Sequence, residues 1–233
     1  MSKQYPVTKV PRHLAIIMDG NRRWAKQNFL KKKLGHYEGA ERLKNILEIS
    51  SKLKIEYLTV YAFSTENWYR DADEVSELMQ LLEHFLDKER DSLIKQKIRL
   101  RVLGDIEDLQ THLQDKLQDV ILATKDFTEF NLNIALNYGS REEIINAIKK
   151  IPTEEIKNLD EKKFSAYLYT NTIPDPDLII RTGGELRLSN FLLWQAAYAE
   201  LYFTEKLWPE FKEAEFYQAI SAFGSRDRRY GLG

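Results

Sequence analysis

Short apolar segments alternate along the chain with longer segments in which apolar residues recur every three or four positions. The short segments are rich in isoleucine, valine, leucine and tyrosine and have the length of β-strands, whereas the longer ones have the period of helices with one apolar face. This alternation is typical of an α/β fold with a central, mostly parallel sheet of six strands surrounded by helices. The predicted strands are residues 14–18, 57–63, 98–103, 132–137, 178–181 and 201–203.

The chain has the size of one large domain, and no stretch rich in proline, glycine or serine divides its 233 residues. We therefore predict a single domain over residues 1–233, of which residues 1–11 form a flexible amino-terminal segment. Hydrophobic residues make up 43% of the sequence, which is enough for a sizeable core.

Charge and cysteine content narrow the functional classes. The 35 lysines and arginines nearly balance the 36 aspartates and glutamates, which gives no reason to expect a nucleic-acid partner. The absence of cysteine excludes disulfides, thiolate zinc sites and cysteine nucleophiles, and it is compatible with a cytoplasmic protein. The longest apolar runs are far shorter than the ~20 residues of a spanning helix, so any membrane contact is expected to be peripheral.

Three polar segments follow predicted strands, which is where α/β proteins bind their ligands. The first contains Asp19, Gly20, Asn21, Arg22, Arg23 and Trp24. Backbone N–H groups at a helix start and an arginine fork suit a phosphate group, and a neighbouring carboxylate suits Mg²⁺ bridging to that phosphate. Taken alone, such a segment is more often an Asp-Gly turn beside solvated arginines, so its interpretation as a phosphate site depends on the other two segments.

The second segment joins the second predicted strand to an amphipathic helix. It contains Ser64, Thr65, Glu66, Asn67, Trp68 and Arg70, which offer hydrogen bonds, an apolar wall and a positive charge. A helix cap followed by an acidic first turn accounts for residues 64–66 equally well. In the third segment, Arg181 ends a strand, and Arg187 and Ser189 follow a pair of glycines. Nearby acids are too few to neutralise both arginines, which favours an anion site.

Further candidates lie outside these segments. His36 is the only histidine beside a glycine, and it follows the basic residues 31–33. Glu200 lies next to the apolar segment 191–199, where a second carboxylate could serve a metal. The basic segment 226–231 has the composition of a solvated tail. Motifs for phosphate loops, dinucleotide binding and zinc helices are absent, and so is the Asp-Asp-x-x-Asp motif of trans-type prenyltransferases.

Residues 13–21, 61–68 and 181–191 together resemble the signature segments of cis-prenyltransferases, especially the bacterial undecaprenyl diphosphate synthases. The resemblance extends over residues 12–231, with the segments in the expected order and spacing. It implies a homodimer whose subunits have a central parallel sheet and an apolar tunnel. It also implies a Mg²⁺-dependent transferase that condenses an allylic diphosphate, typically farnesyl diphosphate, with successive isopentenyl diphosphates. The product would be a cis-polyprenyl diphosphate, the precursor of the lipid carrier for cell-wall polysaccharides.

The resemblance assigns roles to individual residues. Asp19 is expected to handle Mg²⁺ and the diphosphate, and Glu200 to complete the metal site. The residues expected to bind the allylic diphosphate are Gly20, Asn21, Arg22, Arg23, Trp24, Lys32 and His36. Those expected to bind isopentenyl diphosphate are Arg181, Arg187, Leu188 and Ser189, and those expected around the reacting centre are Ser64, Thr65, Glu66, Asn67, Trp68 and Arg70. Asn67 is expected to act with Asp19 in catalysis by orienting the substrate while a diphosphate oxygen accepts the proton, because an amide is a weak base.

The resemblance also concerns product length and the second subunit. The residues of one apolar helical stripe, Val75, Leu78, Met79, Leu82, Phe85 and Leu86, are expected to form a tunnel wall, although plain core packing is the commoner role of such a stripe. Phe130 is expected near the tunnel floor. Arg229, Tyr230 and Gly231 match a terminal motif that reaches the active site across the dimer interface, which replaces the interpretation as a solvated tail.

Two departures from the family pattern and three alternative functions complete the sequence interpretation. Lys32 stands where relatives usually have arginine, and Leu186 where some have histidine, so we expect altered affinity. A non-catalytic subunit of the same fold is one alternative, but such subunits lack the aspartate and flanking arginines that are present here. A short-chain cis-prenyltransferase and a phosphate-binding regulatory module are the others, and the preferred allylic primer is left open.

Overall fold

A computed structural model describes residues 6–226 of the chain. Six strands form one sheet in the order β3-β4-β2-β1-β5-β6, and every adjacent pair is parallel. The strands are β1 (His13–Ile17), β2 (Tyr57–Ser64), β3 (Ile98–Leu103), β4 (Phe130–Tyr138), β5 (Leu178–Arg181) and β6 (Glu200–Phe203). The predicted α/β class is confirmed, and each predicted strand forms with its ends displaced by no more than two residues.

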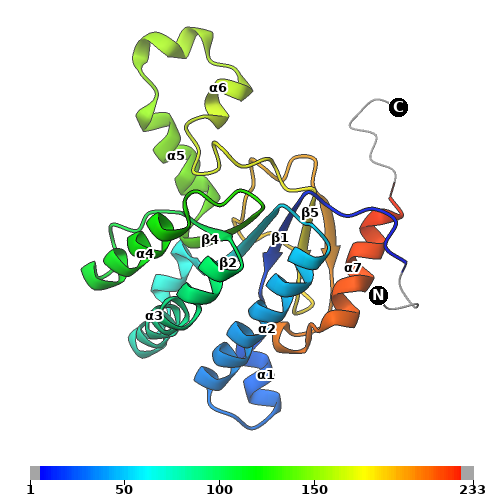
Figure 1. The fold of residues 1–233 in the computed structure, drawn as a ribbon. Helices are drawn as coiled ribbons and strands as arrows, with labels where there is room; N and C mark the ends of the chain where they lie inside the picture. The colour runs from blue at the N-terminus through cyan, green and yellow to red at the C-terminus, as the bar shows by residue number, and fades with distance from the viewer. Residues whose placement is uncertain (1–5, 227–233) are drawn as a thin grey trace.

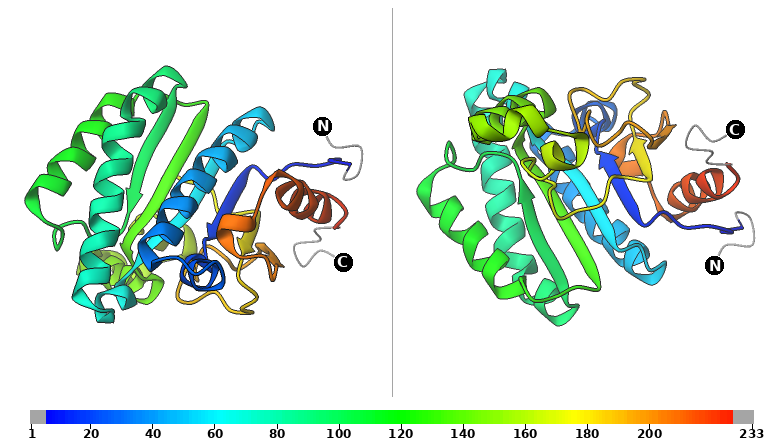
Figure 2. Two further views of the ribbon diagram at one scale, coloured as in Figure 1. Left: turned by 90° about the horizontal axis from the view of Figure 1, so that it is seen from below. Right: turned by 90° about the horizontal axis from the view of Figure 1, so that it is seen from above.

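Helices cover one face of the sheet (Figures 1 and 2), and Phe191 and Leu192 pack against the other face. The α-helices of the described residues are α1 (Asn21–Gln27), α2 (Lys32–Lys52), α3 (Ala72–Lys95), α4 (Thr111–Thr124), α5 (Ser140–Lys150), α6 (Glu161–Ser165) and α7 (Glu213–Gly224). Three 3₁₀ helices are η1 (Thr65–Tyr69), η2 (Thr153–Asn158) and η3 (Trp208–Glu210). α2, α3, α4 and α7 lie on one face, and α5 and α6 project at the top of Figure 1, at the other end of the molecule from α1.

The core explains why β1 is an almost continuous apolar run. All five residues of β1 are buried, and so are all nine of β4. In β1, Leu14 and Ile16 join the cluster under α2, α3, α4 and α7, whereas Ala15 and Ile17 join the cluster on the other face. A strand of a parallel sheet that is covered on both sides is largely apolar on both sides, as β1 is, whereas β4 also buries Asn131, Asn133 and Asn137.

The described part of the amino-terminal segment packs against α7. Val7 and Val10 contact the main core cluster, and the Lys9 ammonium group lies 5.9 Å from the centre of the Phe223 ring. The Thr8 hydroxyl donates to the carbonyl of Gly224 over 3.4 Å. Within the expected flexible segment 1–11, residues 7–10 thus have tertiary contacts, and residues 1–5 lie outside the described part of the chain.

The parallel register brings the ends of three strands together. Ile17, the last residue of β1, pairs with Tyr61 of β2 on one side and with Arg181 of β5 on the other. The segments that follow these strands therefore meet at the carboxyl edge of the sheet, where parallel α/β proteins place their ligands. In the left view of Figure 2, α1 lies just beyond this edge.

Candidate active site

Two polar cavities of about 630 and 570 Å³ open at the carboxyl edge of the sheet. Both are lined by Asp19, Asn21, His36 and Arg70. The first adds Gly20, Arg22, Arg23 and Lys32, and the second adds Ser64, Glu66, Asn67, Arg181, Arg187 and Ser189. The structure thus gathers most of the predicted site residues, although they come from three segments far apart in the sequence and from the start of α2.

Charge in these cavities is strongly one-sided. Their lining contains seven arginines and lysines, namely Arg22, Arg23, Lys26, Lys32, Arg70, Arg181 and Arg187. Among the described residues, the acidic side chains of the same lining are Asp19 and Glu66 alone. A near-neutral chain therefore concentrates positive charge in one place, which suits ligands that carry several negative charges.

Asp19 lies between two arginines that come from different predicted subsites. Its Oδ2 accepts a hydrogen bond from Arg181 Nη2 over 2.9 Å, and its Oδ1 lies 3.2 Å from Arg23 Nη2. Its backbone carbonyl accepts from Thr182 Oγ1 at 2.7 Å and from the backbone N–H of Trp208 at 3.0 Å. The carboxylate is thus fixed in place on both its backbone and its side-chain atoms.

Arg181 is 4% exposed and holds the third segment in position. One end of its guanidinium, Nη1, donates to the backbone carbonyl of Arg187 and to Ser189 Oγ, the latter over 2.7 Å. The other end, Nη2, donates to Asp19. The planar fork of arginine joins three partners at once, which the single ammonium of lysine cannot do.

Gly183 leaves the space that Arg23 occupies. Its φ is +86°, and a Cβ atom added there would lie 2.5 Å from Arg23 Nη2. Any side chain at this position would therefore displace the arginine from Asp19.

Glu74, which the sequence interpretation missed, is the anionic centre of the opposite side of the site. It is 5% exposed, and its Oε1 accepts from Arg70 at 2.9 Å and lies 3.5 Å from Arg22, while its Oε2 lies 3.6 Å from Lys32. Burial by itself would raise the pKa of Glu74, but the attraction of Arg22, Arg70 and Lys32 outweighs it and the pKa is lowered. One carboxylate therefore orients three predicted substrate-binding cations.

His36 lies among these charges without a positive charge of its own. Burial is the main reason why its pKa falls to about 4, and Arg70, Arg22 and Lys32 lower it further against the opposing effect of Glu74. Its Nε2 is buried and has no hydrogen-bond partner among the described residues. The imidazole is thus neutral near pH 7 and has one ring nitrogen available to a ligand.

Asn67 is held by the turn that follows β2. Its Oδ1 accepts the backbone N–H of Ser64 over 3.2 Å, and the Ser64 side chain accepts the backbone N–H of Asn67 in return. The helix cap that the sequence left open for residues 64–66 is therefore present, and Asn67 still lines the cavity. Because its amide oxygen is already engaged, Asn67 is better suited to orient a ligand than to accept a proton.

Some predicted site residues do not line either cavity. They are Trp24, Thr65, Trp68, Leu188 and Glu200. Trp68 packs edge to face on Phe63 at 5.0 Å, and its indole N–H donates to Asn137 Oδ1 over 2.7 Å. Leu188 packs against the second core cluster. Trp68 and Leu188 thus support the walls of the site from behind.

The expected pairing of Asp19 with Glu200 does not form within the chain. Glu200 is the first residue of β6 and pairs with Leu178, at the amino end of β5, whereas Asp19 follows the carboxyl end of β1. The Glu200 carboxylate instead accepts from Arg226 over 2.7 Å. Among residues 6–226, no group of three or more histidine, aspartate or glutamate side chains could hold a metal ion.

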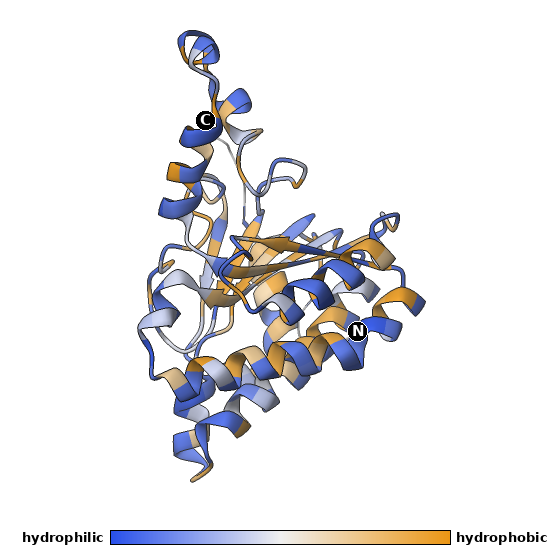
Figure 3. Cartoon of the chain, turned by 90° about the vertical axis from the view of Figure 1, so that its left-hand side faces the viewer, coloured by the Kyte–Doolittle hydropathy of each residue, from blue (hydrophilic) through white to orange (hydrophobic). Residues whose placement is uncertain are grey.

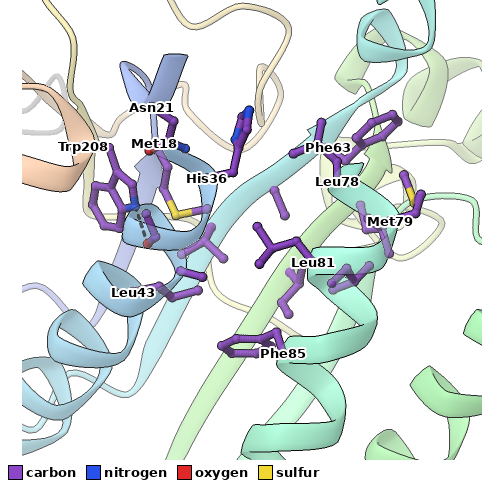
Figure 4. Close-up of a pocket in the computed structure, with 17 residues that line it drawn as sticks. Met18, Asn21, His36, Leu43, Phe63, Leu78, Met79, Leu81, Phe85 and Trp208 are labelled. Atoms are coloured by element: carbon purple, nitrogen blue, oxygen red, sulfur yellow. Dashed lines mark hydrogen bonds between the residues drawn. The ribbon is translucent and has the colours of Figure 1, made fainter. Parts of the chain in front are cut away.

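An apolar cavity of about 110 Å³ adjoins the polar ones (Figure 4). Leu43 of α2 and Leu78, Met79, Leu81 and Phe85 of α3 face each other across it. Four residues of the predicted stripe, Leu78, Met79, Leu82 and Phe85, line this cavity. Phe130 does not line it but lies further along the face of β4 that presents Ile134 to the cavity, and it is buried in the core.

α1 and α2 cross closely beside this cavity. A Cβ atom at Gly35 would lie 2.2 Å from the carbonyl oxygen of Asn21, and one at Gly39 would lie 2.6 Å from Asn21 Oδ1. The carbonyl of Gly39 also accepts the indole N–H of Trp208 over 2.8 Å, which Figure 4 shows as a dashed line. This two-glycine crossing fixes α2 to the backbone of the diphosphate-facing segment.

The predicted tail residues Arg229, Tyr230 and Gly231 lie outside the described residues. Within residues 6–226, no helix has the length and apolar character needed to cross a membrane.

Comparisons with known proteins identify the family of this chain. The family described as "Putative undecaprenyl diphosphate synthase" matches residues 17–231. An isoprenyl transferase of Fusobacterium nucleatum is 50% identical over 95% of this chain and 96% of its own length. The isoprenyl transferase of Thermotoga maritima is 48% identical over 96% of this chain and 97% of its own length.

Solved structures of prenyl diphosphate synthases are also similar to this chain. Lavandulyl diphosphate synthase from Lavandula x intermedia, in complex with dimethylallyl diphosphate, has a TM-score of 0.92 and 37% identity, and it covers 95% of this chain and 98% of that one. A probable undecaprenyl diphosphate synthase from Campylobacter jejuni has a TM-score of 0.80 and 35% identity, with coverages of 96% and 99%. The resemblance of the signature segments is thereby confirmed, and the chain belongs to the undecaprenyl diphosphate synthase family of isoprenyl transferases.

Proposed function

We propose that the protein condenses an allylic diphosphate, farnesyl diphosphate, with successive isopentenyl diphosphates to give a cis-polyprenyl diphosphate of undecaprenyl type, a precursor of the cell-wall lipid carrier. The observation that carries this proposal is the contact between an apolar cavity and two cationic ones, which share Met18, Asn21 and His36. A prenyl diphosphate has the same division into an anionic head and an apolar tail. A relative that binds dimethylallyl diphosphate supports an allylic diphosphate as one substrate.

The cations around Glu74 suit the departing diphosphate. When the allylic C–O bond breaks, negative charge grows on the diphosphate, and fixed charges at Arg22, Lys32 and Arg70 stabilise that charge in the transition state. The carbon fragment becomes cation-like and must be kept from water, which the adjoining apolar cavity provides. The double bond of isopentenyl diphosphate then bonds to the allylic carbon, its C2 loses a proton, and an oxygen of the released diphosphate accepts it.

The second subsite suits isopentenyl diphosphate. Arg187, Ser189 and the part of the Arg181 side chain that lines the cavity provide its donors. Asp19 contacts Arg23 of the first subsite and Arg181 of the second, so it fixes the distance between the two diphosphates. Asn67 orients the isopentenyl group from the same cavity.

Mg²⁺ fits the site only together with a substrate. Asp19 is the carboxylate that lies next to Arg23 and Arg181 in the cationic cavities, and Mg²⁺ commonly takes one or two carboxylates plus phosphate oxygens and water. Bound there with the diphosphate, Mg²⁺ would supply further positive charge against the leaving group.

A short-chain product is the second candidate, and the size of the apolar cavity favours it. A cavity of about 110 Å³ is smaller than the ~150 Å³ cavity that holds one benzene molecule, and it is far too small for a polyprenyl tail. An undecaprenyl-type product therefore requires α3 to move away from α2 as the chain grows.

The proposal includes a homodimer. α5, η2 and the following residues project from the molecule in Figure 1 and expose Ile145, Ile148, Ile156 and Leu159. Isolated exposed aliphatic residues are ordinary, but four on one projecting unit suit a protein interface. Light scattering of the purified protein tests this part, and a monomer at micromolar concentration would contradict it.

The test of the reaction is incubation with Mg²⁺, farnesyl diphosphate and labelled isopentenyl diphosphate, followed by chromatography of the extracted lipids. A ladder that ends near undecaprenyl and disappears in Asp19→Ala supports the proposal. A ladder that stops after one or two additions supports the short-chain candidate. No incorporation by the native protein would support a non-catalytic role.

A further inference from the structure

The turn between α1 and α2 presents apolar side chains to solvent. Phe29 is 98% exposed, and Leu30 and Leu34 are exposed beside it. Phe29 has a φ of 56°, in the left-handed region that bulky residues rarely adopt. Hydrogen bonds hold this conformation, because Leu30 N–H donates to the carbonyl of Ala25 at 2.8 Å and Phe29 N–H to that of Lys26 at 3.2 Å. The structure thus fixes the aromatic ring in an outward position that the core does not use.

Positive charge surrounds this turn. Residues 20–37 contain six arginines and lysines and no aspartate or glutamate. Arg22, Arg23 and Lys32 face acids of the active site. Lys26 and Lys31 have no ion pair within residues 6–226, and Lys33 lies over the ring of Tyr37. These three lysines therefore have no carboxylate partner within the part of the chain that the structure describes.

The turn lies at the mouth of the cationic cavity. Lys26 and Leu30 line that cavity, which is the predicted place of the allylic diphosphate. The turn is the lowest point of the molecule in Figures 1 and 3, far from the projecting α5 and α6, and Figure 3 colours it partly hydrophobic among hydrophilic turns. A surface that bound this turn would lie beside the opening of the cavity, where a polyprenyl diphosphate would leave the protein.

We propose that the turn of residues 26–34 inserts Phe29 and Leu34 into an anionic lipid bilayer, while Lys26, Lys31 and Lys33 contact the lipid phosphates. The inference rests on the proposed function, because a product with a long apolar tail must pass from the protein to a membrane. An apolar tip surrounded by lysines binds such a surface by burying apolar area and by attraction to anionic headgroups. The product can pass directly from the cavity to the bilayer, since Lys26 and Leu30 belong both to the turn and to the cavity lining.

The native chain offers a direct probe, because it has no cysteine. Phe29→Cys, labelled with an environment-sensitive fluorophore, gives a reporter at the tip, and Leu122→Cys, at an exposed position of α4, gives the matched control. Vesicles of phosphatidylcholine with phosphatidylglycerol should shift the emission of the first reporter to shorter wavelength and leave the second unchanged. An unchanged tip reporter, or equal shifts at both positions, would overturn the proposal.

Binding strength provides the second measurement. In vesicle sedimentation, the double variant Phe29→Ser with Leu34→Ser should lower the partition coefficient at least tenfold, and Leu122→Ser should not change it. Lys31→Gln and Lys33→Gln should each weaken binding to anionic vesicles about fivefold and have no effect on neutral ones. Sedimentation of the double variant like the native protein would overturn the proposal.

Two further readouts distinguish a membrane contact from a contact between subunits and from a defect in the reaction. If the double variant changes the oligomeric state in ultracentrifugation without lipid, the tip contacts a second copy and the membrane proposal is wrong. Prenyl transfer in detergent should be the same in the double variant and the native protein, since neither residue lines the site. Native turnover without native vesicle binding would refute this inference alone, whereas vesicle binding without turnover would refute the proposed function.

Discussion

Arg181→Lys tests whether the second subsite depends on the fork of a buried arginine or only on its charge. The native guanidinium makes three hydrogen bonds, to the Arg187 carbonyl, to Ser189 Oγ and to Asp19. A lysine ammonium at this depth keeps the charge but reaches one of these partners. Two charge-assisted hydrogen bonds are therefore lost, at about 1.5 kcal/mol each, for a total of about 3 kcal/mol or two powers of ten.

Steady-state kinetics with each substrate varied separately is the assay. We expect kcat/KM for isopentenyl diphosphate to fall about a hundredfold, while KM for the allylic diphosphate changes less than about threefold, because Arg22, Arg23 and Arg70 are untouched. Arg187→Lys is the matched control, since Arg187 is largely exposed and its side chain forms an ion pair with Glu185. Its loss should be about tenfold or less. Equal losses in the two variants, or an equal loss for both substrates, would refute the reasoning.

Three further predictions concern the remaining parts of the site. Phe85→Ala should lengthen the products in the chromatographic assay, because Phe85 lines the apolar cavity. Phe130→Ala should lengthen them less, because Phe130 does not line this cavity. A larger effect of Phe130→Ala would place the floor of the tunnel at Phe130. The pKa of His36, about 4 in the free protein, should rise when inorganic diphosphate binds beside it, while that of His13, also about 4 and buried at the other end of β1, should stay unchanged in an NMR titration. In the free protein both histidine pKa values lie below the unfolded value near 6.5, so these two histidines should lower the free energy of unfolding as the pH falls from 6.5 toward 4. Bound diphosphate should reduce that loss, because it raises the pKa of His36. Asn67→Asp should lower turnover, because a carboxylate repels the diphosphate; raised turnover with unchanged KM would show that residue 67 acts as a base.

The residues at the carboxyl edge of the sheet could be predicted from the sequence because short, continuous segments identify them. A strand followed by a glycine and arginines reveals its own carboxyl end, and a parallel sheet brings all such ends together. Asp19, Arg23 and Arg181 could be named on that ground, and they are in contact in the structure. The resemblance to the family added Asn67 and His36, whose own surroundings were ambiguous.

Glu74 and Glu200 show where local signals fail. Glu74 follows Arg70 by four residues, which on a helix surface describes an ordinary exposed pair. Its burial among cations depends on Arg22 of α1 and Lys32 of α2, which are distant in sequence. Glu200 was expected beside Asp19, yet it starts a strand and so lies at the opposite end of the sheet. A motif identifies residues without telling which end of a strand they occupy.

The two-glycine crossing of α1 and α2 makes the two sides of the apolar cavity mechanically unequal. Gly35 and Gly39 bring α2 into backbone contact with Asn21, so α2 cannot retreat without disturbing the diphosphate site. α3 contains no glycine that would allow such a contact, and the stripe that faces α2 belongs to it. A growing chain would therefore displace α3 and leave α2 in place. Selection for a longer or shorter product can then act on α3 without changing the diphosphate site.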